Sequence, residues 1–128
     1  MRLDSLDTLF SEYIRKRALQ QTGGCERCGT PKYDIQRDDS ILPAWMLLQC
    51  SHFIGRSKRA TRWDEDNAAG LCPGCHMYFT SHPLEHVEFF KARLGDDFDL
   101  LQARARAIKP DKEAIRLYLE VKIKEMED

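Results

Sequence analysis

The sequence predicts a small α+β fold that forms a single domain over residues 1–128. Three observations support this prediction. Apolar residues recur at helical spacing toward both ends of the chain, an apolar stretch in the middle is typical of a strand, and two Cys-x-x-Cys pairs flank that stretch. A chain of 128 residues is long enough to bury one modest hydrophobic core.

A helix is predicted in the N-terminal segment, residues 1–24. Apolar side chains return every three or four positions from Asp4 to Gln21, and Gly23 and Gly24 then supply a common helix terminator. This helix leads directly into the first cysteine pair. The residues expected on its buried face are Leu6, Leu9, Phe10, Tyr13, Ile14 and Arg17.

The cysteine pairs predict a structural zinc site. Cys25 and Cys28 form one pair, and Cys72 and Cys75 form the other. Two intervening residues let both thiolates of a pair reach one ion, and two such pairs complete a tetrahedral site. Disulfides are not expected, because the sequence carries no export signal and a reducing compartment keeps thiols free.

The surroundings of the two pairs differ. Glycines beside the first pair permit a sharp turn, whereas Pro73 suits the first turn of a helix that starts at the second pair. The 43 intervening residues, 29–71, exceed the roughly 15–20 of a simple zinc ribbon, so a further element is inserted. A turn, a long hairpin and a helix in this order predict a treble-clef zinc finger over residues 25–82.

The middle of the insertion reads as a strand. Residues 44–52 are largely apolar and follow Pro43, although their periodicity is also compatible with a helix. His52 would end this strand. Cys50 lies two positions earlier and would face the same side, near a site or the zinc. The alternative for Cys50 is a buried thiol.

Three residues around the second cysteine pair form a pattern. His52 ends the predicted strand, Asn67 lies five positions before the pair, and His76 follows the pair directly. This pattern resembles the HNH (ββα-metal) endonuclease superfamily over residues 25–82. Within it, the cysteine before the histidine, the basic loop and the aromatic-Asp-x-Asp-Asn stretch are similar to phage-borne recombination nucleases of the NinG/Rap type.

The resemblance implies a metal-dependent endonuclease that hydrolyses phosphodiester bonds of DNA. It assigns His52 as the general base, since an imidazole with a pKa of about 6.5 accepts a proton from water at neutral pH. It places a divalent ion (Mg²⁺, Mn²⁺ or Zn²⁺) at His76, and Asn67 would hold the loop that carries His52 through amide hydrogen bonds. The narrower resemblance implies structure-selective cleavage in recombination.

One position departs from the family pattern. Many HNH enzymes carry an aspartate immediately before the base histidine, where this chain has Ser51. A neutral hydroxyl binds a hard cation less well than a carboxylate does. The ion would then depend on His76, water and phosphate, or on a further ligand. The candidates are Asp64, Asp66 and His82.

A basic loop follows His52. The net charge of −1 and the pI of about 6.4 give no sign of nucleic-acid binding, but the charge is unevenly distributed. Cations next to a catalytic histidine would bind phosphates and give salt-dependent affinity with little sequence specificity. The alternative is a solvated loop. The cations of this loop are Arg56, Lys58, Arg59 and Arg62.

The C-terminal segment, residues 83–128, is predicted to be helical support. Helices are expected over residues 84–94, 97–108 and 111–125. Predicted core residues are Leu84, Val87, Phe89, Phe90 and Leu94, His86 is interpreted as structural, and Arg104 and Arg106 as a solvated face. An alternative role for the last helix is dimerisation, or docking to a phage protein, through an apolar stripe. Its members are Ile115, Leu119, Lys122, Ile123 and Met126.

Two classes of function remain open. The first is the metal-dependent DNA endonuclease, and the second is a non-catalytic zinc-finger module that binds DNA or protein. No apolar run approaches the roughly 20 residues that cross a bilayer, and the first ten residues are unlike a signal peptide. We therefore expect a cytoplasmic protein without a membrane partner, in a bacterial host if it is phage-encoded.

Overall fold

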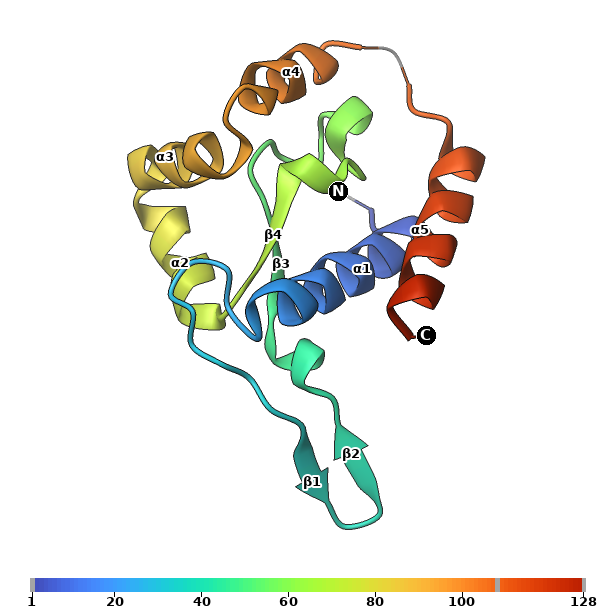
Figure 1. Ribbon diagram of the computed structural model, residues 1–128. Helices are drawn as coiled ribbons and strands as arrows, with labels where there is room; N and C mark the ends of the chain where they lie inside the picture. Colours follow the sequence, from blue (N-terminus) through green and yellow to red (C-terminus); the bar gives the residue numbers. More distant parts are fainter. Residues whose placement is uncertain (1, 108, 128) are drawn as a thin grey trace.

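The computed structural model describes residues 2–107 and 109–127. In this part the chain forms five α-helices and two antiparallel two-stranded sheets (Figure 1), which confirms the predicted α+β class. The helices are α1 (Ser5–Thr22), α2 (Pro73–Ser81), α3 (Pro83–Leu94), α4 (Asp97–Arg104) and α5 (Lys112–Glu127). The strands are β1 (Ile35–Arg37), β2 (Ser40–Leu42), β3 (Gln49–His52) and β4 (Ala68–Leu71).

Helix α1 runs through the centre of the fold. Its first turn is capped reciprocally, because the Asp4 carboxylate accepts from the Leu6 N–H at 2.8 Å and the Asp7 carboxylate accepts from the Asp4 N–H at 2.7 Å. The helix ends at Gly23, whose φ of 77° lies in the left-handed region that favours glycine. These bounds confirm the predicted N-terminal helix.

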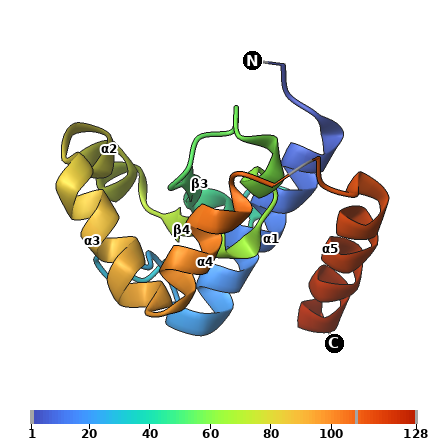
Figure 2. The same cartoon turned by 90° about the horizontal axis from the view of Figure 1, so that it is seen from above.

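The β3–β4 hairpin lies between two groups of helices. Its register pairs His52 with Ala68, and all four residues of β4 are buried. Helices α1 and α5 lie on one side, and α2, α3 and α4 on the other (Figures 1 and 2). The crossing of α1 and β4 requires Gly70, since a Cβ there would stand 2.5 Å from the Ala18 Cβ.

Each side of the hairpin has its own hydrophobic cluster. The cluster toward α2, α3 and α4 contains Leu48, Ala69, Leu71, Phe79, Phe90 and Phe98. The cluster toward α1 and α5 contains Leu6, Phe10, Ile14, Trp63, Leu119 and Ile123. Leu119 and Ile123 belong to the apolar stripe predicted as a docking face. That prediction is wrong for these two residues, because α1 buries them.

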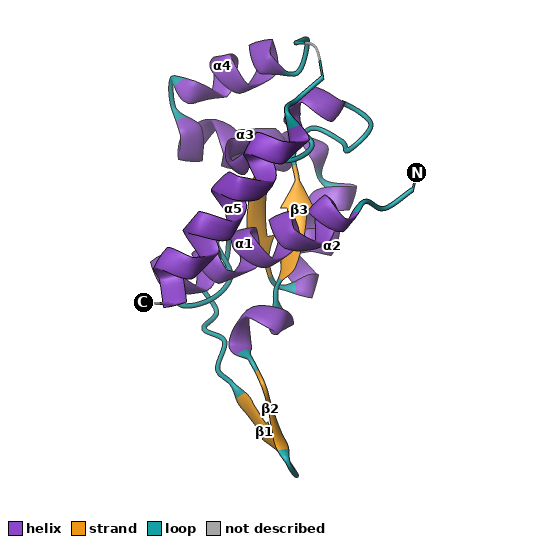
Figure 3. Cartoon of the chain, turned by 90° about the vertical axis from the view of Figure 1, so that its right-hand side faces the viewer, coloured by secondary structure: helices purple, strands orange, loops and turns teal. Residues whose placement is uncertain are grey.

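The β1–β2 hairpin projects from the body of the molecule (Figures 1 and 3). At its base the Asp34 carboxylate accepts from the Ala44 N–H at 2.8 Å, directly after Pro43. The chain then forms a 3₁₀ helix over Ala44–Leu47, and the strand of the predicted region is limited to Gln49–His52. The strand prediction for residues 44–47 is therefore wrong.

The C-terminal segment differs from its prediction at three points. Helix α4 ends at Arg104, earlier than expected, and the predicted end at Ile108 lies outside the described residues. Leu84 is 79% exposed, because it lies in the first turn of α3 on the solvent side. The Arg104 side chain is 41% exposed, as a solvated face requires, but its guanidinium also pairs with Asp64 at 2.7 Å and Asp66 at 3.0 Å, which was not predicted.

Helix length and hydropathy also bear on membrane insertion. Among residues 2–107 and 109–127, no helix is both long and apolar enough to span a bilayer.

Candidate active site

The four cysteines of the two pairs converge on one point. Their Sγ atoms all lie within 4.8 Å of one another, and those of Cys28 and Cys72 are 3.8 Å apart. Zinc–sulfur bonds of about 2.3 Å in a tetrahedron place sulfur atoms about 3.8 Å apart. The cluster of Cys25, Cys28, Cys72 and Cys75 can therefore hold a structural metal such as zinc.

Local backbone geometry explains why the cysteines meet. The first pair lies in a tight turn in which the Gly29 N–H donates to the Cys25 carbonyl at 2.9 Å, and Gly29 has a φ of 73°. The second pair begins α2, with Cys72 as its N-terminal cap and Pro73 in its first turn. Since His76 follows this pair, a metal in the cluster would also fix the position of His76.

His52 and His76 line a common cavity of about 500 Å³. His52 reaches it from the end of β3, and His76 reaches it from the first turn of α2. Helix α1 forms a further wall and contributes Asp7 and Arg15. Cys50 also lines the cavity, as its position two residues before His52 predicted.

Hydrogen bonding fixes the tautomer of His52. Its Nε2 lies 2.9 Å from the Arg62 carbonyl oxygen, which can only accept, so Nε2 carries the proton and Nδ1 keeps a free lone pair. Burial lowers the pKa of His52 below its ordinary 6.5, whereas the hydrogen bond to the Arg62 carbonyl acts in the opposite direction. His52 is therefore neutral near pH 7 and can accept a proton at Nδ1.

The Asn67 amide joins the two ends of the loop between β3 and β4. Its Nδ2 donates to the Ile54 carbonyl at 2.9 Å and to the Thr61 carbonyl at 3.0 Å, and its Oδ1 accepts from the Ile54 N–H at 2.7 Å. Asn67 is completely buried. These are the loop contacts that the sequence analysis expected of this asparagine, and they hold the backbone that follows His52.

We predict that Asn67→Ala lowers the free energy of unfolding by about 2–4 kcal/mol, because the buried loop groups lose their partners. Urea denaturation of the metal-loaded protein measures this change. Gln36→Ala is the matched control, since the Gln36 amide also bonds backbone carbonyls but on the exposed β1–β2 hairpin. It should alter stability by less than about 0.5 kcal/mol. Equal effects of the two substitutions would contradict the structural role of Asn67.

One ring nitrogen of His76 has no hydrogen-bond partner in the part of the chain that the structure describes. This atom, Nδ1, is buried. In that same part of the chain, the four cysteines are the only group of three or more His, Cys, Asp or Glu side chains close enough to share an ion. The cavity therefore holds no preformed group of three such ligands among the described residues.

The other suggested ligands do not line this cavity. Ser51 is 2% exposed and lies on the face of β3 opposite His52. Asp64 and Asp66 are engaged by Arg104. The ring of His82 stacks on Tyr78, with centroids 3.8 Å apart. We therefore do not propose Ser51, Asp64, Asp66 or His82 as ligands of a cavity metal.

The basic loop divides into an outer and an inner part. Arg56 lines the cavity, and Arg56 and Arg59, together with Arg2, line a second cavity of about 480 Å³ beside it. Lys58 is exposed. Arg62 is buried and pairs with Asp7, although it also borders the second cavity, so its role as a phosphate contact stays a prediction. The pairing compensates a charge that burial removes from water.

Asp7 is a residue of this site that the sequence analysis did not identify. Burial by itself would raise its pKa, but hydrogen bonds from Arg62, the Asp4 N–H and the Trp63 indole lower it to about 2. The Asp7 carboxylate accepts hydrogen bonds from the Arg62 guanidinium, and the Arg62 carbonyl accepts one from His52 Nε2. The spacing of Asp4 and Asp7 is that of a capping box, a sequence signal that indicates a helix start but not the pairing of Asp7 with Arg62.

Comparisons with known proteins identify no family and no relative of this chain. No protein-family model matches the chain, and neither a curated protein nor a solved structure matches it.

Proposed function

We propose that this protein is a metal-dependent DNA endonuclease of the HNH type, built on a treble-clef zinc finger. In this proposal the cysteine cluster holds zinc, and β3, β4 and α2 form the ββα element. One observation carries the proposal: His52 and His76 reach the same cavity from β3 and α2. The hydrogen bonds of Asn67 to the intervening loop support it.

The arrangement suits phosphodiester hydrolysis. His52 Nδ1 would take a proton from water, the water oxygen would form a bond to phosphorus, and the bond to the 3′ oxygen would break. The departing oxygen takes a proton from solvent, which leaves a 5′-phosphate and a 3′-hydroxyl. His76 would hold Mg²⁺, Mn²⁺ or Zn²⁺, which when bound polarises the phosphate and stabilises the leaving oxygen.

The charges around the cavity favour a nucleic-acid backbone as substrate. Arg56 belongs to both cavities, so a strand at His52 would continue past Arg2 and Arg59. Contacts of this kind bind phosphates without reading sequence. We therefore propose little sequence specificity, with structure-selective cleavage in phage recombination, inside the bacterial host, as the narrower proposal.

The proposal predicts cleavage of DNA that depends on added metal. Zinc-loaded protein should nick supercoiled plasmid when Mg²⁺ or Mn²⁺ is present. Cleavage should stop when EDTA is added, and excess Mg²⁺ should restore it. Zinc content is measured in parallel, so that loss of the structural metal is distinguished from loss of the cavity metal.

A panel of linear, single-stranded, forked and four-way DNA then defines the preferred substrate. Absence of metal-dependent cleavage throughout this panel would falsify the endonuclease proposal and leave the non-catalytic zinc-finger module.

A further inference from the structure

Arg15 lies in the candidate active site although it belongs to α1, outside the ββα element. Its side chain lines the cavity that contains His52 and His76. Two contacts hold it: its Nε donates to the Ser11 carbonyl at 3.1 Å, and its guanidinium carbon lies 4.7 Å from the centre of the Trp45 ring. The guanidinium is therefore positioned in advance of any ligand.

The charge of Arg15 has no acidic partner within residues 2–107 and 109–127. Glu12, one turn earlier on the same helix, pairs with Lys16 at 2.9 Å. Burial raises the pKa of the nearby Cys50 thiol to about 12, so Cys50 is neutral. Asp7 supplies the carboxylate of the cavity wall, and Arg62 already neutralises it.

The cavity is therefore a cationic site. Two arginines, Arg15 and Arg56, line it, and the one carboxylate among its lining residues, that of Asp7, is paired with Arg62. Burial also lowers the pKa of Arg15, because water solvates its charge incompletely. A cation in this state gains more from an anion than a fully solvated one does, and a guanidinium can hold two oxygens of one phosphate.

We propose that Arg15 binds the non-bridging oxygens of the scissile phosphodiester in this cavity, together with Arg56; this inference rests on the proposed nuclease function. Arg15 then stabilises the negative charge that grows on these oxygens as water attacks phosphorus. Removing one such positioned donor typically lowers a rate by about 10²–10³-fold. The substrate contact thus comes from a helix that precedes the zinc-binding region.

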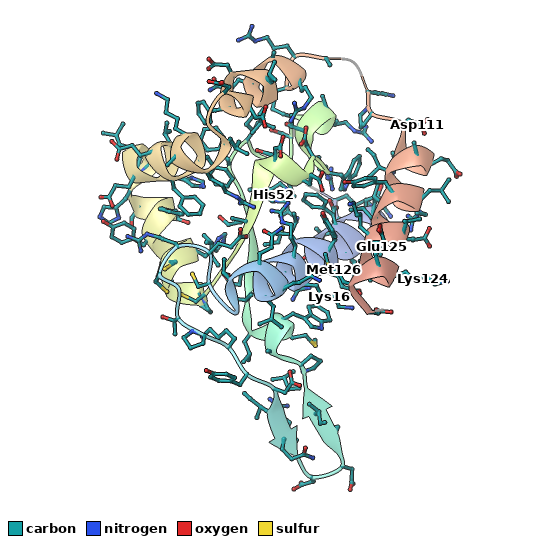
Figure 4. All side chains as sticks on the ribbon, viewed as in Figure 1. Lys16, His52, Asp111, Lys124, Glu125 and Met126 are labelled. Carbon is teal, nitrogen blue, oxygen red and sulfur yellow. The ribbon has the colours of Figure 1, made fainter. Side chains whose placement is uncertain are left out.

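The chain offers a matched control in the next residue. Lys16 has the same charge on the same helix and also lies over the Trp45 ring, at 5.2 Å from its centre. Its side chain lines a different groove with Leu19 and Met126. Figure 4 places Lys16 next to Met126, apart from His52. Lys16→Ala therefore removes a charge of the same sign from a side chain that does not line the cavity.

The test compares Arg15→Ala, Arg15→Lys and Lys16→Ala in the full chain, each checked for zinc content and thermal unfolding. Single-turnover cleavage should fall by about 10²–10³-fold in Arg15→Ala and by less than about twofold in Lys16→Ala. Added guanidinium ion should restore part of the rate of Arg15→Ala. A purely structural role for Arg15 predicts no such rescue. If Arg15→Ala loses zinc or unfolds, the cleavage rate of Arg15→Lys is compared with that of Lys16→Ala instead. Arg15→Lys keeps the charge but loses the planar fork, so its rate should still be the lower of the two.

A second measurement separates this inference from the proposed function. Affinity for a single-stranded oligonucleotide is measured without divalent metal, and it should be weaker in Arg15→Ala than in Lys16→Ala. If folded Arg15→Ala cleaves and binds like Lys16→Ala, the inference is overturned while the nuclease proposal stands. If no form of the protein cleaves DNA, the nuclease proposal fails, and the inferred phosphate site stands or falls on the affinity difference alone.

Discussion

His52→Ala should lower the rate of metal-dependent DNA cleavage by about 10²–10⁴-fold without unfolding the protein. His52 lines the cavity, and because its Nε2–H donates to the Arg62 carbonyl, Nδ1 is the ring nitrogen that can accept a proton. Single-turnover plasmid nicking measures the effect. His82→Ala is the matched control, because His82 stacks on Tyr78 and does not line the cavity. This variant should cleave DNA at the rate of the intact protein. A His52→Ala protein that cleaves within threefold of the intact chain would show that the base is another group.

The pH dependence tests the same role independently. Burial lowers the pKa of His52 below 6.5, and only the neutral imidazole can accept a proton. Cleavage should therefore rise as the pH increases through this lowered pKa and should be level by about pH 7. His52→Ala should lose this rise. A rate that falls between pH 5 and pH 7 in the intact protein would contradict the assignment.

Loss of the metal from the cysteine cluster should unfold the region around it. Zinc binding in small fingers is worth about 10–16 kcal/mol, comparable to or larger than the roughly 5–15 kcal/mol that stabilise a whole domain. Cys72→Ser removes one thiolate of the cluster at the N-terminus of α2, the helix that also carries His76. We expect about one zinc per intact chain by metal analysis, and a large drop in zinc content and in melting temperature for the variant.

Cys50→Ser provides the control for this experiment. It makes the same chemical change, but Cys50 lies outside the four-cysteine cluster. The variant should keep its zinc and most of its stability. If Cys72→Ser retains zinc and melts like Cys50→Ser, the cluster does not carry a structural metal.

Local patterns made part of the structure predictable. The spacing within each cysteine pair encodes a turn and a helix start, so the metal cluster follows from a few neighbouring residues. The helix over Ser5–Thr22 follows from its periodicity and its caps. The placement of Cys50 and His52 on one side follows from strand alternation. Each of these features depends on interactions over short stretches of chain.

The remaining features depend on contacts between distant segments. Arg62 reads as one more cation of a basic loop, yet it is buried against Asp7, 55 positions away in the chain. Arg104 likewise meets Asp64 across 40 positions. Periodicity places a charged residue on a helix or in a loop, but it does not say which opposite charge the fold brings to it. For the same reason the contribution of Arg15 to the cavity was not predicted.

The link from Asp7 through Arg62 to His52 bears on how the protein can be divided. A fragment confined to residues 25–82 keeps the cysteines and both cavity histidines, but it lacks the carboxylate that anchors Arg62 and the helix that walls the cavity. The shortest fragment that keeps this cavity intact would therefore begin at the cap of α1. Fusion partners or purification tags placed at the N-terminus would lie beside the cavity of Arg2 and Arg59, whereas the turn between β1 and β2 offers an attachment point in a projecting, exposed arm.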